Sequence, residues 1–298
     1  MLLHITHDTH YRYSPDVEAA QHLAYLRPRD HTGQEVLTFD LDVRPTPALY
    51  QEQTDVFGNT RSFFTLTSAH PALQVVAQSK VRTQAPAVPE SNCDWEAARD
   101  QFTYRGGQTM DKAAEFVFAS PFVPRESAFA DYAAASFVPG AGLLAAAVDL
   151  MGRMHRDFRY ESRSTEINTP ARQALAQRRG VCQDFAHIFI ACLRSQGLPA
   201  RYVSGYMLTQ TLPGQPRLLG ADASHAWASV YLPDLPEGRR WVDLDPTNKR
   251  WGWGAPGEDY VTVAHGRDFG DVSPLRGVIQ GGSRHTLTVG VTVEALEA

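Results

Sequence analysis

Apolar and polar residues alternate near the beginning of the chain in the manner of β-strands. In residues 37–43, Leu-Thr-Phe-Asp-Leu-Asp-Val, every second residue is apolar, a period typical of a half-buried strand. Residues 55–59, Asp-Val-Phe-Gly-Asn, are typical of a turn and precede another strand candidate at 61–67. Residues 1–84 are therefore predicted to form a small, β-sandwich-like domain.

The pattern changes after this β domain. A segment with Pro86 and Pro89 and few large apolar residues is typical of a linker. Three stretches rich in Ala, Leu and charged residues at helix-like spacing then follow, at 94–102, 110–118 and 142–158. We therefore expect a linker and helical segment over residues 85–140 and a second domain over residues 141–298.

Two helices are predicted at the centre of the second domain. Thr169 can cap free backbone N–H groups, and Pro170 suits the first position of a helix that runs to about Arg178. Gly180 is expected to end this helix. The next begins around Cys182 and stops at Gly197, and its apolar residues recur at helical spacing: Phe185, Ile188, Phe189, Cys192 and Leu193.

The rest of the chain is strand-like. Short segments rich in β-branched and aromatic residues are separated by turn residues, at 200–208, 225–232 and 240–245. Residues 285–293 alternate Leu or Val with polar or small residues, which predicts a final strand. A core helix followed by an antiparallel sheet is expected, so the predicted fold class is α+β.

Composition and charge exclude several functions. The 298 residues carry a net charge of −5 with a pI near 6.1, whereas nonspecific nucleic-acid binders present clusters of Lys and Arg. Apolar runs are too short to span a membrane and the first residues lack an export signal, so we expect a cytoplasmic protein without membrane or nucleic-acid partners. The oligomeric state stays open. Three widely spaced cysteines form no disulfide framework and no zinc pair, which favours reduced thiols.

Cys182 is the candidate nucleophile among these thiols. Only a thiolate attacks an acyl carbon efficiently, and the unpaired N–H groups of a helix N-terminus favour that charged form. The alternative is a small buried apolar residue, as most free cysteines are. Cys192 lies mid-helix among apolar residues and is predicted to be inert. Cys93 lies near the linker and has no evident partner.

A histidine and an aspartate follow Cys182 in order along the predicted strands. His225 shares a strand face with Trp227, so we expect its ring to reach a helix packed across the sheet and to act as base and acid. An aspartate would orient the imidazole and stabilise its charged form. Asp243 and Asp245 share one face of the next strand, and spacing alone does not choose between them. Either could be an ordinary strand-end residue.

Three sequence blocks around these residues resemble the signature of the bacterial transglutaminase-like superfamily. They are Gly-Val-Cys-Gln-Asp-Phe-Ala-His at 180–187, Ser-His-Ala-Trp at 224–227 and Val-Asp-Leu-Asp-Pro-Thr-Asn at 242–248. Residues 10–14, 27–29 and 55–59 are similar to the β-rich N-terminal domain of such proteins, and 266–272 to a segment near the end of the family's core. Residues 85–138 carry no recognised likeness.

This resemblance implies a papain-like or transglutaminase-like core with a catalytic triad. It implies Cys182 as nucleophile, His225 as base and Asp245, the aspartate before Pro246, as third member. The implied reaction is attack on a peptide or glutamine side-chain amide of a protein or peptide substrate, through a thioester.

What releases the thioester decides the activity. Water makes a cysteine protease or amidase, and an amine acceptor makes a transglutaminase that forms isopeptide crosslinks. We favour hydrolysis because no channel for a second substrate is identifiable. A non-catalytic interaction module on the same fold is a further alternative, which the intact triad disfavours. The chemistry requires no cofactor and no metal, and no acidic loop indicates a calcium site.

The oxyanion hole is less well defined by the sequence. The backbone N–H of Cys182 is one natural donor, and Tyr160 is a candidate for the second. Gln183 and Asp184 could instead hold the start of the helix in place.

Two other groups of residues are weaker candidates for a site. His4, His7 and His10 resemble a metal triplet, but on a strand His7 would face away from the other two. Trp251 and Trp253 could line a substrate groove or simply pack.

Overall fold

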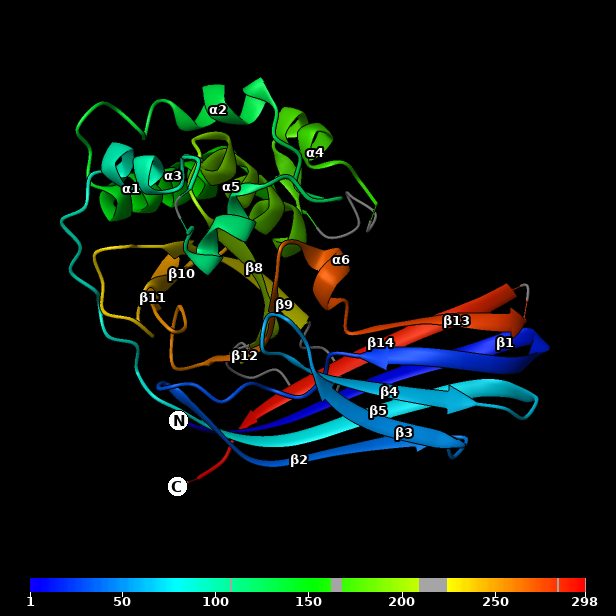
Figure 1. Ribbon diagram of the computed structural model, residues 1–298. Helices are drawn as coiled ribbons and strands as arrows, with labels where there is room; N and C mark the ends of the chain where they lie inside the picture. The colour runs from blue at the N-terminus through cyan, green and yellow to red at the C-terminus, as the bar shows by residue number, and fades with distance from the viewer. Residues whose placement is uncertain (108, 162–167, 209–223, 283, 298) are drawn as a thin grey trace.

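The molecule is built from a layer of helices, a five-stranded sheet and a long curled sheet. The computed structural model describes residues 1–107, 109–161, 168–208, 224–282 and 284–297. In Figure 1 most helices lie on one side of the smaller sheet, and the long strands of the larger sheet extend away beyond it. This arrangement is the predicted α+β fold with a β-rich N-terminal domain. None of the helices in the described ranges is long and apolar enough to cross a membrane.

The long curled sheet is organised around its first strand. Within the described residues it contains seven strands: β1 (Leu2–Ala24), β2 (Gln34–Arg44), β3 (Leu49–Thr54), β4 (Thr60–Leu66), β5 (His70–Thr83), β13 (Leu275–Gly281) and β14 (Arg284–Ala295). β1 pairs along one edge with β5 and then β4, and along the other with β14 and then β13. The long strand β1 thus belongs to both halves of the sheet, one with β4 and β5 and the other with β13 and β14. This sheet has an apolar core of its own around Phe64, Leu66 and Leu73.

The end of the chain completes this N-terminal sheet. The strand predicted at 285–293 is present, but β13 and β14 pair with β1, and not with the five-stranded sheet. The expectation that residues 141–298 form one domain therefore differs from the structure in its last segment. Alternation in β14 shows which side chains are buried, but it carries no information about which strand lies alongside.

The segment after β5 connects the two sheets through helices. Residues 84–93 contain no helix or strand, as expected of a linker. The three predicted helical stretches correspond to α1 (Trp95–Gln101), the 3₁₀-helix η1 (Lys112–Val117) and α3 (Leu143–Asp157). A short helix, α2 (Ser127–Ala133), was not predicted from the sequence.

The five-stranded antiparallel sheet has the strand order β11-β10-β9-β8-β12 in the described part of the chain. Its strands are β8 (Ala200–Met207), β9 (Ser224–Tyr231), β10 (Trp241–Asp245), β11 (Arg250–Trp253) and β12 (Tyr260–Gly266). The first three coincide with predicted strands. The elements around the sheet are β6 (Arg159–Tyr160), α4 (Ala171–Gln177), β7 (Arg179–Gly180), α5 (Cys182–Ser195) and α6 (Phe269–Val272).

The boundary between α4 and α5 differs from the prediction in detail. Pro170, and not Thr169, occupies the N-cap position of α4, and the residue in the left-handed conformation at its C-terminus is Arg178, with φ 53°. Gly180 lies two residues after Arg178, in β7, which pairs in parallel with β6. Its lack of a side chain matters at the candidate site.

Candidate active site

Cys182 is the first residue of α5, the helix at the centre of the core. It is partly exposed, whereas the following turns of α5 are almost entirely buried. The Asp184 carboxylate accepts a hydrogen bond of 2.8 Å from the backbone N–H of Val181, the N-cap residue. A Cβ on Gly180 would come within 2.6 Å of that carboxylate. Glycine at 180 therefore allows Asp184 to cap the helix that presents Cys182.

His225 and Asp245 lie together beside this helix start. The Nε2 atom of His225, in β9, is 2.7 Å from Oδ2 of Asp245, the last residue of β10. Burial lowers the pKa of His225, but the charge and hydrogen bond of Asp245 and a hydrogen bond with Cys182 outweigh burial and raise the pKa to about 10. With Nε2 directed to Asp245, the other ring nitrogen is left to face the thiol. The structure thus brings the three predicted residues together.

Asp245 is fully buried and held by several donors. The Tyr260 hydroxyl and the Asn248 side-chain amide each donate to its Oδ2 at 2.8 Å, and the backbone N–H of Thr247 donates to Oδ1 at 2.9 Å. Burial raises the pKa of the Asp245 carboxyl, but His225, Asn248 and Tyr260 more than offset this, and the pKa lies below its ordinary value. These interactions favour the carboxylate form.

Asn248 and Tyr260 were not identified from the sequence. Asn248 belongs to the third signature block, and its position three residues after Asp245 was an available signal. Tyr260 is 15 residues away in β12, so only the fold reveals its contact with Asp245.

Asp243 occupies a different environment from Asp245. It accepts a hydrogen bond from the Ser229 hydroxyl, and Arg201 is its charged neighbour. Burial raises the pKa of Asp243 despite these contacts. Of the two aspartates that spacing left open, Asp245 is therefore the one that contacts the imidazole.

The expectation about the face of β9 is wrong. Ala226, Ala228 and Val230 share one apolar cluster with α5, whereas Trp227 lies in a separate small cluster with Tyr260. The helix thus packs on the alanine face. His225 meets Cys182 even so, because it stands near the beginning of β9 beside the start of α5.

The other two cysteines occupy environments that disfavour a thiolate. Cys192 is fully buried, and burial raises the pKa of its thiol to about 12. Burial and the neighbouring Asp234 and Asp94 also raise the pKa of Cys93. Cys182 is the cysteine that lies at a helix start beside an imidazole.

Residues near the nucleophile offer candidates for an oxyanion hole. Tyr160 pairs with Gly180, two residues before Cys182, and is 51% exposed. Tyr202 is buried, and burial together with the charge of Cys182 raises the pKa of its hydroxyl. This buried hydroxyl, whose pKa the charge of Cys182 affects, was not anticipated from the sequence.

The weaker candidates fall into structural positions. His7 points inward and its Nδ1 lies 2.9 Å from the Tyr206 hydroxyl, whereas His4 is 3.5 Å from Glu294 on the outer face. No group of three metal-ligating side chains occurs in the ranges that the structure describes. Trp251 packs against the main core, and the guanidinium of Arg239 lies 4.7 Å from the ring centre of Trp253.

Comparisons with known proteins agree with this architecture. Residues 3–82 match the family described as the bacterial transglutaminase-like N-terminal region, and residues 133–246 match the transglutaminase-like superfamily. A crystal structure of a proposed cysteine protease from Cytophaga hutchinsonii superposes with a TM-score of 0.74 at 20% identity, covering 100% of this chain and 91% of that one. At this identity the likeness concerns the fold.

Two mycobacterial relatives extend the similarity to nearly the whole sequence. An uncharacterized protein of Mycobacterium leprae is 29% identical over 297 residues, which cover 99% of each chain. An uncharacterized protein of Mycobacterium tuberculosis is 38% identical over 301 residues, which cover 98% of this chain and 91% of the relative. With a relative of that similarity and family matches in both of its domains, this chain belongs to the bacterial transglutaminase-like family.

Proposed function

We propose that this protein is a thiol-dependent hydrolase that cleaves peptide or glutamine side-chain amide bonds in a protein or peptide substrate. Cys182 is the nucleophile, His225 the general base and acid, and Asp245 the residue that orients and charges the imidazole. The observation that carries the proposal is the buried His225 ring, which contacts the thiol of Cys182 and the carboxylate of Asp245. No cofactor is needed for this chemistry.

The reaction would proceed in two acyl-transfer steps. The Cys182 thiolate attacks the amide carbonyl carbon, and the carbonyl oxygen becomes an oxyanion. As the C–N bond breaks, His225 gives its proton to the departing amine, and a thioester remains on Cys182. His225 then takes a proton from water while the water oxygen attacks the thioester, so that a carboxylic acid leaves and the thiolate returns.

The raised pKa of His225 suits the first of these steps. A charged imidazolium beside Cys182 holds the proton that the leaving amine needs. The backbone N–H of Cys182 is the first proposed oxyanion donor. Tyr160 and Tyr202 are the candidates for the second.

Selective alkylation tests the activated nucleophile. Iodoacetamide at neutral pH should label Cys182 much faster than Cys93, with Cys192 unlabelled in the folded protein, and His225→Ala should slow the labelling of Cys182. The rates are read by mass spectrometry of peptides from the digested protein. Equal rates at Cys93 and Cys182, or no effect of His225→Ala, would remove Cys182 from the role of nucleophile.

A second experiment separates hydrolysis from crosslinking. Glutamine-containing peptides are incubated with the protein with and without a primary amine, and acid and amide products are quantified. Acid or cleaved peptide in the presence of amine supports the hydrolase. Accumulation of the amine adduct identifies a transglutaminase instead. Cys182→Ala serves as the matched control, because it removes the nucleophile and leaves the rest of the site.

A further inference from the structure

Two carboxamides of the N-terminal domain cover the outer edge of the catalytic sheet. β12 is the edge strand of the five-stranded sheet, and its second edge faces the N-terminal domain. The Gln34 amide donates to the carbonyl of Thr262 and accepts from its N–H, both at 2.8 Å. The Asn59 amide donates to the carbonyl of His265 at 2.7 Å and accepts from its N–H at 2.8 Å. Each side chain thus supplies the pair of hydrogen bonds that a neighbouring strand would make.

A β-bulge in β12 directs the backbone groups of Thr262 and His265 to the same edge of the strand. Thr262 is opposite Gly205 of β8, but Ala264 is opposite Ser204, so β12 carries one additional residue between them. In a regular strand, residues three apart direct their N–H and C=O groups to opposite edges. Because of the bulge, Thr262 and His265 both present these groups to the N-terminal domain.

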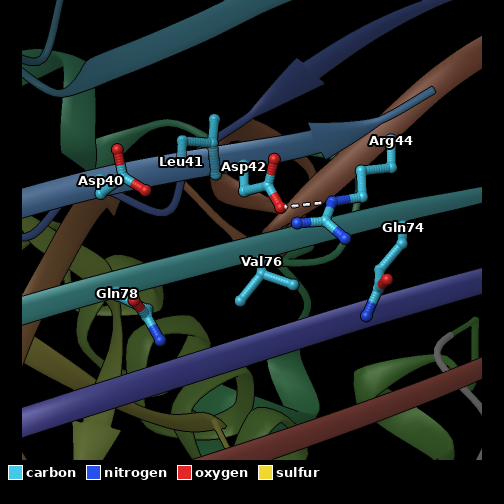
Figure 2. A pocket seen from close by; sticks show the side chains of 7 residues that line it. All are labelled: Asp40, Leu41, Asp42, Arg44, Gln74, Val76 and Gln78. Carbon is cyan, nitrogen blue, oxygen red and sulfur yellow. Dashed lines mark hydrogen bonds and ion pairs between the residues drawn. The ribbon is translucent and has the colours of Figure 1, made fainter. Parts of the chain in front are cut away.

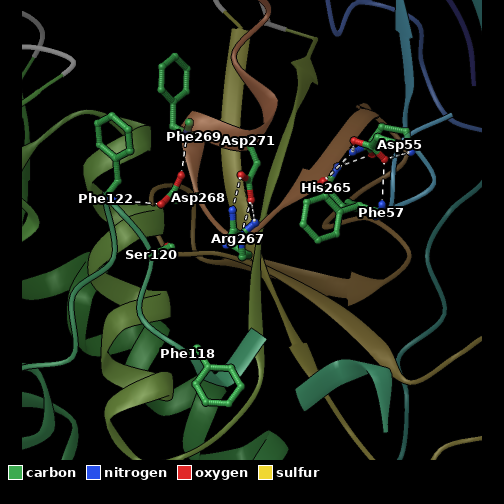
Figure 3. Close-up of polar contacts among 12 residues, drawn as sticks. Asp55, Phe57, Phe118, Ser120, Phe122, His265, Arg267, Asp268, Phe269 and Asp271 are labelled. Carbon is green, nitrogen blue, oxygen red and sulfur yellow. Dashed lines mark hydrogen bonds and ion pairs between the residues drawn. The ribbon is translucent and has the colours of Figure 1, made fainter. Parts of the chain in front are cut away.

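The two carboxamides are held rigidly. Gln34 is 3% exposed, and its amide nitrogen also donates to the carbonyl of Arg29 at 2.6 Å. Asn59 is fully buried, and its amide nitrogen also donates to the Asp55 carboxylate at 2.8 Å. Figure 3 shows this junction, where Asp55, which accepts a hydrogen bond from the backbone N–H of Phe57, lies near His265. Side chains with so many fixed partners define the position of the strand they bind.

The same strand carries a hydroxyl that contacts the candidate triad. β12 begins with Tyr260, two residues before Thr262, and the Tyr260 hydroxyl donates to Asp245 at 2.8 Å. The guanidinium of Arg250, held by Asp259 at 2.6 Å, lies 4.9 Å from the centre of the Tyr260 ring. A shift of β12 along or away from β8 would therefore move the hydroxyl relative to the carboxylate.

We propose that the N-terminal β domain is a positioning element for the catalytic residues. Gln34 and Asn59 hold β12, and β12 holds Tyr260 against Asp245, which keeps that carboxylate aligned with His225. The inference rests on the proposed function of Cys182, His225 and Asp245. It assigns to Gln34, Asn59 and Tyr260 a role that acts through Asp245, without contact with substrate.

A double-mutant cycle on the alkylation rate of Cys182 tests the proposal. Gln34→Met keeps the length of the side chain and removes its hydrogen bonds, and Tyr260→Phe removes only the hydroxyl. Each change should slow labelling by iodoacetamide at pH 7 by about 10-fold, the factor expected for one hydrogen bond to a charged group. Each should also move the acidic limb of the rate profile to higher pH, because Asp245 then stabilises the imidazolium less. Together they should slow labelling no more than Tyr260→Phe alone.

Gln74→Met is the matched control. Gln74 lies on the same curled sheet, and its amide donates to Asp8 at 3.1 Å, away from the catalytic sheet. Figure 2 shows it beside Val76 and Gln78 of β5, in a shallow pocket that Asp40 and Asp42 also line. This variant should label at the wild-type rate.

The buried thiol of Cys192 reports whether each variant is folded, since it should be alkylated only after unfolding. If Gln34→Met exposes Cys192, Gln34→Asn, which keeps the amide but shortens its reach, replaces it in the same cycle. Independent, multiplying effects of the two changes would overturn the proposal, as would a folded Gln34 variant with the wild-type rate and pH profile. A wild-type Cys182 no more reactive than Cys93 would instead contradict the proposed function itself.

Discussion

At the scale of single residues, substitutions of the two buried aspartates of β10 should affect turnover very differently. Asp245→Asn keeps the shape of the side chain but removes the charge that stabilises the imidazolium, so turnover should fall by about 1,000-fold or more. Asp243→Asn should leave turnover close to wild type, because Asp243 accepts a hydrogen bond from Ser229 and has Arg201 as its charged neighbour, whereas Asp245 is the aspartate that contacts His225. Amide hydrolysis measured for both purified variants gives the comparison. Similar losses in the two would mean that Asp245 has no special relation to the imidazole.

The pair of His225 and Asp245 also predicts a pH dependence of stability. Folding raises the pKa of His225 from 6.5 to about 10. Its contribution to the free energy of unfolding is therefore complete below pH 6.5 and is lost as the pH rises through about 10. Folding lowers the pKa of Asp245 from 3.8. Its contribution to the free energy of unfolding is therefore present above pH 3.8 and is lost as the pH falls below that value.

His225→Gln should therefore reduce the free energy of unfolding by about 3 kcal/mol near pH 7, the usual cost of breaking a buried ion pair. The difference between variant and wild type should shrink above pH 10. Urea unfolding at pH 7 and at pH 10.5 measures both values. A difference that is the same at both pH values would show that His225 is neutral in the folded protein.

Sequence and structure agree best at this residue scale. Cys182 and His225 were predicted because nucleophile and base chemistry restricts residue types and positions, and the family resemblance chose Asp245 over Asp243 as the carboxylate. Asn248 follows Asp245 by three residues, and this spacing was an available signal, whereas the contact of Tyr260 with Asp245 requires no particular spacing in the sequence. A tyrosine 15 residues away on a strand that is not adjacent to β10 gives no local signal.

At the scale of elements, the start of α5 depends on a glycine that was predicted for another reason. Gly180 was expected to end α4, but its lack of a side chain instead admits the Asp184 carboxylate at the N-terminus of α5. Gly180→Ala should cost about 1–3 kcal/mol of unfolding free energy through overpacking, and should slow the alkylation of Cys182 as its helix start is displaced.

Gly106→Ala is the control for that substitution. A Cβ at Gly106 would meet no atom within 4 Å, so the change should alter stability by less than about 0.5 kcal/mol and leave the alkylation rate unchanged. Thermal unfolding and thiol labelling are measured for both variants. If Gly180→Ala behaves like Gly106→Ala, close packing of Asp184 is not what places Cys182.

Secondary structure was predictable where a segment carries enough periodic residues to define its face. The long strands and α3 and α5 satisfy that condition. The short helix α4 was found instead from the Thr169-Pro170 start signal, whereas α2, which also has seven residues, was missed. Periodicity also gave the wrong helix-covered face for β9, because both faces of this strand are buried. Every residue of β9 after Ser224 is buried, including Ala226 and Trp227. A strand that is buried on both sides has no alternation from which its helix-covered face could be chosen.

At the scale of the whole molecule, the two ends of the chain and the transglutaminase-like core form one packed unit. β14 lies beside β1, so residues more than 270 positions apart share hydrogen bonds, and no local pattern could have predicted this pairing. Leu3 and Ile5 of β1 and Val291 and Val293 of β14 belong to the same apolar cluster as α5. The N-terminal sheet thus contributes directly to the core that holds the candidate nucleophile helix.

This shared core predicts different effects from two neighbouring valines of β14. Val291 is 1% exposed within the main cluster, whereas Val289, two residues earlier on the same face, is 48% exposed. Val291→Ala should lower the free energy of unfolding by about 2 kcal/mol through lost burial and a cavity, and Val289→Ala by less than about 0.5 kcal/mol. Urea unfolding followed by tryptophan fluorescence compares them. Because Val291 packs into the cluster that contains α5, Val291→Ala should lower the stability of the whole protein in a single cooperative unfolding transition. A separate early transition would show that the N-terminal sheet unfolds independently of the transglutaminase-like core.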